Sequence, residues 1–180
     1  MFHHKNIRLS PNSYLGCQSY FVTICCSGRR PIFSDPAACQ WLTEILRSES
    51  AARNFAVHAY CVMPDHVHFL AEGICPSSSL LVLVKALKIK TSRAHAQMTE
   101  QPLWQKKFYD HIVRPHESIG SIAWYVWMNP VRKGLARVVG EYPFAGSFTQ
   151  LSFQIAASSH FWCPPKVSKA PASEGGRYNP

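Results

Sequence analysis

The stretch "FAVHAYCVMPDHVHFLAEG" (residues 55–73) predicts a β-hairpin, and the rest of the fold can be arranged around it. Its two halves are rich in β-branched and aromatic residues, and the Pro-Asp pair between them suits a tight turn. Side chains alternate between the two faces of a strand, so His66 and His68 share one face while Val67 and Phe69 share the other. One face of the hairpin is therefore expected to enter the core, and the opposite face carries two imidazoles.

Strands and helices are expected to alternate along the chain. The predicted strands are residues 19–26, 55–63, 66–73 and 108–114, and the predicted helices are residues 36–54, 77–97 and 117–129. Pro130 is expected to end the last helix, because the residue before a proline disfavours the α conformation. This order predicts an α+β fold, a ferredoxin-like antiparallel sheet with helices on one face and an extra C-terminal helix that carries Tyr125.

The composition predicts one domain with an extension at each end. We expect an N-terminal extension over residues 1–18, the domain over residues 19–146 and a largely disordered tail over residues 147–180, where Pro, Gly, Ser and Lys are frequent. No apolar run approaches the roughly 18 residues of a membrane span, and the N-terminus lacks the layout of a secretory signal. A cytoplasmic protein is expected.

Charge favours an anionic partner. The chain has 19 Lys and Arg against 10 Asp and Glu, a net charge of +9, and nucleic acid is the commonest partner of so basic a small protein. Charge that serves only solubility is the alternative. The seven cysteines form no CxxC pair, which favours neither a disulfide framework nor a zinc knuckle.

The two histidines are candidate metal ligands. Residues two apart on a strand lie about 7 Å apart, so both imidazoles of His66 and His68 can converge on one cation. For an isolated pair, two solvated surface histidines are the alternative, and a metal site needs a third ligand. Tyr125 and Asn129 are four residues apart and share one helical face, which would bring an amide oxygen and a phenol to the histidines. Two imidazoles and an amide oxygen suit Mg²⁺ or Mn²⁺.

Several ordered motifs together resemble a known family. "SYFVTICCSGRRPIF", "YCVMPDHVHFLAEG", "FYDHIVR" and "AWYVWMNPVRKGL" are similar to the single-tyrosine HUH transposases of the insertion-sequence-200-like family, with the REP-associated tyrosine transposases as the nearest group. The resemblance implies cleavage of single-stranded or hairpin DNA through a 5′-phosphotyrosine intermediate. It implies Tyr125 as the nucleophile and His66, His68 and Asn129 as ligands of a divalent metal ion. Asp65 stands where the family more commonly has Asn.

The DNA contacts are predicted from basic and aromatic side chains. Basic residues can follow a phosphate backbone and aromatic rings can stack on unpaired bases, although surface charge and core packing are the alternatives. The candidates are Lys85, Lys88, Arg93, Trp104, Arg114 and Arg132. Two other functions remain open, a hairpin-binding regulatory module without catalysis and a phosphoesterase that uses water. The oligomeric state, monomer or homodimer, is also open.

Overall fold

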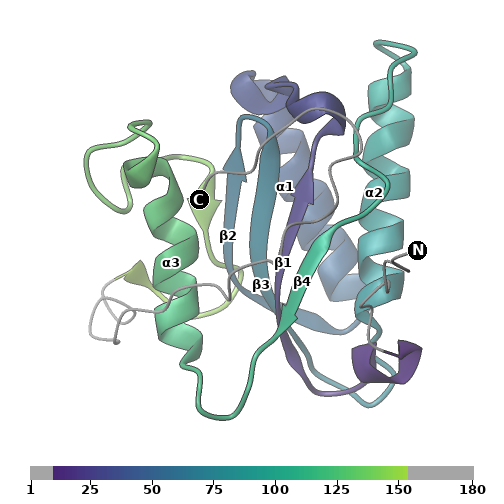
Figure 1. Cartoon of the computed structure of the whole chain (residues 1–180), viewed down its shortest axis with the longest axis vertical. Helices are drawn as coiled ribbons and strands as arrows, with labels where there is room; N and C mark the ends of the chain where they lie inside the picture. Colours follow the sequence, from purple (N-terminus) through teal and green to yellow (C-terminus); the bar gives the residue numbers. More distant parts are fainter. Residues whose placement is uncertain (1–9, 154–180) are drawn as a thin grey trace, which may run out of the picture.

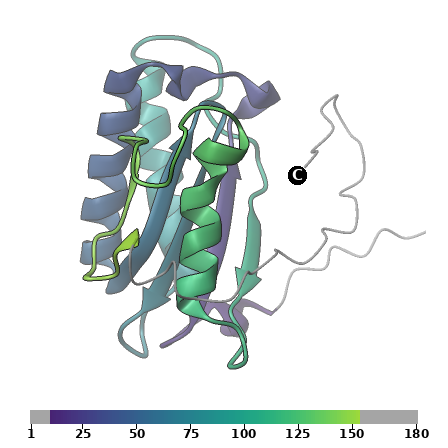
Figure 2. The ribbon, with the colours of Figure 1, turned by 90° about the vertical axis from the view of Figure 1, so that its left-hand side faces the viewer.

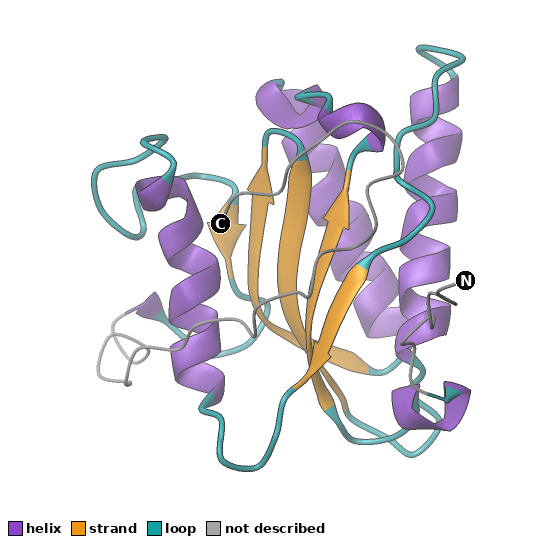
Figure 3. Cartoon of the chain, in the orientation of Figure 1, coloured by secondary structure: helices purple, strands orange, loops and turns teal. Residues whose placement is uncertain are grey.

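The computed structural model describes residues 10–153, which form a five-stranded antiparallel sheet with helices on both faces (Figures 1 and 3). The strands run in the order β4-β1-β3-β2-β5. Their bounds are β1 Ser19–Cys25, β2 Phe55–Met63, β3 His66–Gly73, β4 Tyr109–Ile112 and β5 Ala145–Gly146, and the helices are α1 Pro36–Ala52, α2 Leu80–Ala96 and α3 Ile119–Arg132. The predicted α+β class, the hairpin and the three helices are confirmed, and β5 is an additional short edge strand.

The helices divide between the two faces of the sheet. Figure 2 shows α1 and α2 along one face and α3 across the other. Val67 and Phe69 of β3 pack with α1 and α2, whereas Leu70 packs with α3. The alternation expected from the sequence therefore places His66 and His68 on the face that α3 covers in part.

The start of α1 follows from its sequence. Asp35 caps the helix by accepting a hydrogen bond from the Ala37 backbone N–H at 3.1 Å, and Pro36 occupies the first turn, where its missing N–H costs nothing. Leu42 and Leu46 then lie one helical turn apart and are fully buried against the sheet. The cap and the apolar face together fix this helix on the first face of the sheet.

A buried carboxylate joins α1 to α2. Glu49 is 1% exposed, and its side chain forms ion pairs with Lys90 of α2 and with Arg53 just beyond α1. The contact of Arg53 with Oε2 is an ion pair without hydrogen-bond geometry, and Lys90 remains 56% exposed. Because its partners reach solvent, the cluster keeps the buried charge compensated without burying three ions.

The end of α3 differs from the sequence prediction. The helix does not end at Asn129 but continues through Pro130 to Arg132. Pro130 has no N–H for the carbonyl of Val126, and the Asn129 side chain supplies the missing donor: its Nδ2 lies 3.1 Å from Val126 O and 2.9 Å from Tyr125 O. The side-chain amide thus replaces the lost backbone bond, which lets the helix run on for its last residues.

The segment after residue 146 is packed as far as the structure describes it. Phe148 packs against Tyr60 with ring centroids 4.7 Å apart, and Phe153 forms a T-shaped contact with Trp127 at 4.6 Å. The packed part of the chain therefore continues past the predicted boundary at residue 146. The remainder of the predicted tail, and residues 1–9 of the predicted extension, lie outside the described residues. Within residues 10–153, no helix has the length and apolar character that crossing a membrane requires.

Candidate metal and nucleophile site

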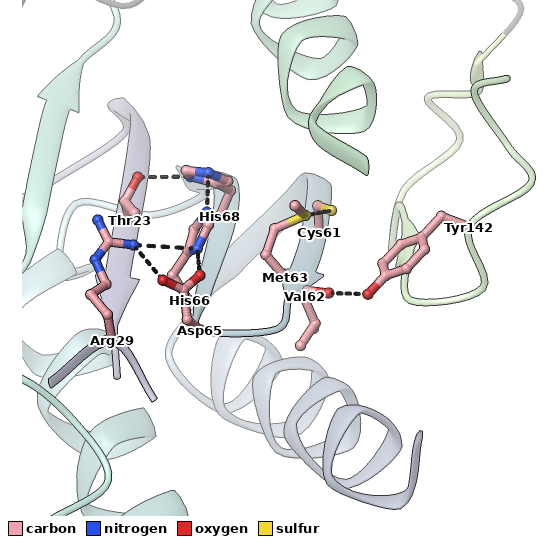
Figure 4. Close-up of polar contacts among 9 residues, drawn as sticks. All are labelled: Thr23, Arg29, Cys61, Val62, Met63, Asp65, His66, His68 and Tyr142. Carbon is pink, nitrogen blue, oxygen red and sulfur yellow. Dashed lines mark hydrogen bonds and ion pairs between the residues drawn. The ribbon is translucent and has the colours of Figure 1, made fainter. Parts of the chain in front are cut away.

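The two histidines of β3 meet at their Nε2 atoms. His66 Nε2 and His68 Nε2 are 2.9 Å apart, and both side chains are buried on the face of the sheet toward α3 (Figure 4). Their rings are nearly perpendicular, with an interplanar angle of 83°. Strand alternation alone would leave the imidazoles about 7 Å apart, so the side-chain conformers bring them together.

Both imidazoles form hydrogen bonds through their Nδ1 atoms, on the side of the ring away from the Nε2 contact. His68 Nδ1 lies 2.8 Å from the hydroxyl of Thr23, its direct cross-strand partner on β1, and His66 Nδ1 lies 2.5 Å from Asp65 Oδ1. Arg29 completes the chain of contacts in Figure 4, because its Nη1 lies 3.1 Å from Asp65 Oδ2. When each Nδ1 carries the ring hydrogen, both Nε2 lone pairs face the same point.

Burial sets the protonation of this site. Desolvation lowers the pKa of His68 well below its ordinary value, and the nearby His66 and Arg29 act in the same direction. Burial raises the pKa of Asp65, but the hydrogen bond and charge of His66, with those of Arg29, outweigh it and leave that pKa below the ordinary value. The site is thus a neutral imidazole beside a carboxylate that is already paired with an arginine.

The histidine pair fits a divalent cation as two of its ligands. Two nitrogens bound at right angles at about 2.1 Å from one ion lie about 3.0 Å apart, close to the observed 2.9 Å. Without a cation, the same separation suits an N–H···N hydrogen bond between the two rings. Within residues 10–153 no group of three or more His, Cys, Asp or Glu side chains is arranged to hold a metal ion.

Tyr125 and His68 both contact the ring of Phe21. Phe21 of β1 stacks on His68 with centroids 5.5 Å apart and meets the edge of Tyr125 at 5.8 Å. Tyr125 is 7% exposed, and the guanidinium of Arg132 lies 4.6 Å from its ring centroid. Arg132 is an exposed side chain, so part of the cover over the tyrosine is a group that can move into solvent. The Tyr125 ring itself is buried and belongs to the same apolar cluster as Phe21.

Asn129 lies one helical turn after Tyr125 on α3, and it is buried. Its Nδ2 is committed to backbone carbonyls of its own helix. The orientation leaves Oδ1 as the side chain's acceptor, the atom that the predicted ligand role requires. That role of Asn129 remains a prediction.

The predicted DNA-contacting residues divide between the two faces of the sheet. Lys85 and Arg93 are exposed on α2, on the opposite side of the sheet from the histidines. Lys88, also on α2, donates to the carbonyls of residues 105 and 106 at 2.6 and 3.1 Å. Arg114 is exposed just after β4, and Arg132 lies at Tyr125. Only Arg132 of this set is placed beside the candidate nucleophile.

Trp104 requires a correction. It is 6% exposed, its indole N–H donates to Thr91 Oγ1 at 2.7 Å, and its ring packs at 5.4 Å from that of Phe33. A ring so enclosed cannot stack on a nucleobase while the core stays closed. Trp104 is a core residue, and the prediction that it is a stacking platform is wrong.

Three contributors to the site were missed at the level of sequence. Thr23, Phe21 and Arg29 come from β1 and the turn after it, more than 35 residues before the histidines they contact. Arg29 lies there because two successive residues, Gly28 and Arg29, adopt positive φ values of 62° and 55°. The pairing register of β1 with β3 would have identified Thr23 and Phe21, but no single segment of sequence contains that register.

Comparison with known proteins identifies a family and two curated relatives that this chain resembles. A family model described as "Transposase IS200 like" matches residues 16–127. A Haemophilus influenzae protein, provisionally named a REP-associated tyrosine transposase, is 23% identical over 112 residues, covering 56% of this chain and 64% of the relative. The Escherichia coli K12 REP-associated tyrosine transposase is 30% identical over 96 residues, covering 52% of this chain and 54% of the relative. The chain thus matches less than two thirds of the length of either curated relative.

A solved structure shows the same fold. The structure of a REP-associated tyrosine transposase bound to a REP hairpin superposes with a TM-score of 0.63 at 23% sequence identity. The superposition covers 73% of this chain and 78% of the other.

Proposed function

The chain belongs to the IS200-like transposase family, and on that premise we propose that it is a metal-dependent nuclease and strand transferase for single-stranded DNA. The observation that supports this most directly is the histidine pair, whose Nε2 atoms converge at 2.9 Å on the face that carries Tyr125. Tyr125 is the nucleophile in this proposal. Phe21 fixes the relative position of the tyrosine and His68, because its ring contacts both.

The proposed reaction is attack by the Tyr125 hydroxyl oxygen on a backbone phosphorus. The new bond joins phosphorus to the tyrosine oxygen, the bond to the 3′ oxygen breaks, and the phenolic hydrogen is balanced by the hydroxyl formed on the departing strand. The 5′ phosphate stays attached to the protein, so the 3′-hydroxyl can reverse the step without an external energy source. The guanidinium of Arg132 lies at the tyrosine ring, and in this proposal it contacts the phosphate that is attacked.

We further propose that His66, His68 and the side-chain oxygen of Asn129 hold the divalent cation, Mg²⁺ or Mn²⁺. When bound, such an ion neutralises charge on the phosphate oxygens and so favours attack by a weak nucleophile. The protein's own contribution is to orient the ligands. In the proposed metal-binding tautomer, Thr23 and Asp65 accept the Nδ1 hydrogens of the two imidazoles, which fixes both rings with Nε2 toward the site.

Hairpin DNA is the proposed partner. Two curated relatives carry the name REP-associated tyrosine transposase, and the solved neighbour holds a REP hairpin. Arg132 lies beside the nucleophile, and the exposed Arg114 follows the edge strand β4. The net charge of +9 would attract the phosphate backbone.

The test is formation of a covalent protein–DNA adduct. The full chain is incubated with labelled hairpins that carry single-stranded flanks, with Mg²⁺ or Mn²⁺, and the denatured protein is assayed for attached label. Tyr125→Phe should abolish the adduct, because it removes the attacking oxygen and keeps the ring contacts. Tyr142→Phe is the matched control, since Tyr142 packs against the same face of the sheet and donates to the Val62 carbonyl at 2.9 Å.

The outcomes separate the proposal from its two alternatives. A hairpin-binding module without catalysis would bind DNA in a salt-dependent manner and give no adduct with either metal. A phosphoesterase that uses water would still cut DNA after Tyr125→Phe and leave no protein attached. Undiminished adduct from Tyr125→Phe would remove the tyrosine from the mechanism.

A further inference from the structure

A cavity of about 190 Å³ opens directly beside the histidine pair. It lies between the turn that joins β2 to β3 and the segment that follows α3, and its lining residues are Met63, Pro64, Asp65, His66, Lys133 and Leu135. A larger cavity of about 300 Å³, between α1 and the segment around Phe144, lies on the other face of the sheet. Because His66 lines the smaller cavity, a group that fills it lies against one of the proposed metal ligands.

The motif after Asn129 builds one wall of this cavity. The chain leaves α3 through Gly134, whose φ of +68° is a left-handed conformation that glycine adopts without strain. The Leu135 N–H then donates to the carbonyl of Pro130 at 2.8 Å, which folds the chain back onto the end of the helix. Leu135 is 44% exposed, an apolar side chain at the rim of a cavity. The sequence "PVRKGL" thus forms a structured turn that presents Lys133 and Leu135 toward His66.

The chemistry of the lining suits a flat, uncharged ring attached to an anionic backbone. Met63, Pro64 and Leu135 offer apolar contacts, and a methionine thioether adapts well to an aromatic partner. Lys133 is an exposed lining residue, and its ammonium can pair with a phosphate. Asp65 is already neutralised by Arg29 at 3.1 Å, so its carboxylate presents little repulsion to an incoming phosphodiester. A nucleobase of single-stranded DNA has this combination of a π-face and adjoining phosphates.

We propose that this cavity receives the base of a nucleotide flanking the phosphate that Tyr125 attacks, and that it thereby sets base preference next to the cleaved bond. This inference rests on the proposed function. Its physical basis is continuity, because the cavity and the candidate metal site share His66 as a common wall. Leu135 is then a specificity-determining residue, whereas Lys133 contributes backbone affinity that does not depend on sequence.

The experiment uses a library of DNA hairpins with a fixed stem and fully randomised single-stranded flanks. In one arm the full chain reacts with the library in Mg²⁺, and the covalently attached strands are sequenced. In the other arm the Tyr125→Phe protein selects bound DNA by filter retention, and flank positions are counted from the stem. The second arm needs no cleavage, so the cavity can be tested even if the adduct never forms.

The wild-type protein should show a base preference at one flank position, and in the first arm that position should adjoin the cut. Leu135→Ala should weaken this preference about fivefold, because it removes much of one apolar wall. Lys133→Ala should lower recovery of all sequences alike. Val138→Ala is the matched control, an apolar residue 63% exposed that does not line the cavity, and it should leave the preference unchanged.

Different outcomes would overturn cleavage by Tyr125 and base binding in the cavity. Absence of adduct together with a Leu135-dependent preference in the bound pool would overturn the cleavage proposal and support the base-binding cavity. A preference that is absent in both arms, or that Leu135→Ala leaves as strong as in the wild type, would overturn the cavity assignment whether or not adduct forms.

Discussion

Replacing Phe21 with leucine should separate the chemistry of the site from the stability of the sheet. The ring of Phe21 is buried and stacks on His68 at 5.5 Å, meets Tyr125 at 5.8 Å and meets Tyr109 at 6.1 Å. Each aromatic pair is worth about 0.5–1.5 kcal/mol beyond the area it buries. Contacts that share one ring are not additive, so we expect Phe21→Leu to cost about 2 kcal/mol of unfolding free energy.

Phe69→Leu is the matched control. Phe69 is a fully buried phenylalanine of the adjacent strand, but it faces α1 and α2 on the other side of the sheet. Its replacement should cost about 1–2 kcal/mol through a small cavity. For a chain of this size, each kilocalorie corresponds to a melting-temperature shift of about 2–4 °C, so both variants should stay folded at room temperature.

The rate of adduct formation should distinguish the two variants. Phe21→Leu removes the surface against which both the imidazole and the phenol are positioned, and a displacement near 1 Å can cost about 100-fold in rate. We expect a loss of about 10- to 100-fold for Phe21→Leu and less than about twofold for Phe69→Leu, measured as initial rates in Mg²⁺ well below both melting temperatures. Equal losses in the two variants, or a full rate for Phe21→Leu, would refute the claim that this ring positions the site.

Three further predictions concern the rest of the molecule. Glu49→Gln should lower the free energy of unfolding by about 1–3 kcal/mol, measured in a thermal melt followed by circular dichroism. The control Glu44→Gln, at an exposed position, should change it by less than about 0.5 kcal/mol. Equal effects would mean that the buried ion pairs do not stabilise the fold. Gly73→Ala should lower the free energy of unfolding by about 1–3 kcal/mol, because its Cβ would lie 2.2 Å from a backbone carbonyl oxygen. An unchanged midpoint of urea unfolding would show that the neighbouring loop moves aside without cost. Hydrogen bonds, above all that of Ser77, lower the pKa of the Cys75 thiol to about 7. The rate at which iodoacetamide alkylates Cys75, followed on the peptide that contains it, should therefore rise through about pH 7 and then level off. Ser77→Ala should move the midpoint of this rise to higher pH, and an unchanged midpoint would contradict this cause.

The elements of the fold could be predicted because their signals are local. The hairpin of residues 55–73 alternates with the period of a strand, and the apolar spacing in residues 36–54 has the period of a helix. The order β4-β1-β3-β2 is that of the predicted ferredoxin-like sheet, but the register of each strand pair could not be predicted, since pairing of β1 with both β3 and β4 joins segments far apart in sequence. The edge strand β5 has only two residues, too few to carry a period.

The relative placement of the candidate site residues was predictable where one element carries them. His66 and His68 share a strand face by alternation, and Tyr125 and Asn129 share a helix face by spacing. Trp104 shows the limit of that reasoning: an aromatic residue in a loop near lysines has the same sequence context whether it is exposed or buried. Its burial is decided by contacts with other elements, which local sequence does not contain.

Replacing Asn129 cannot by itself test whether it is a metal ligand, because the same side chain also supports the helix at Pro130. The amide nitrogen of Asn129 supplies the donor that Pro130 lacks, so replacing Asn129 with alanine removes a candidate ligand oxygen and also leaves the Val126 carbonyl without that donor. The second effect loosens the helix turn that carries Tyr125 and Arg132, and activity would fall even if the amide oxygen never met a cation. Pro130 leaves the Val126 carbonyl without a backbone donor, and the Asn129 amide nitrogen takes that place. This hydrogen bond fixes the orientation of the amide, with its oxygen pointing away from the helix backbone. A ligand role for Asn129 therefore depends on the orientation that Pro130 imposes, and the two residues act as one unit at the end of α3.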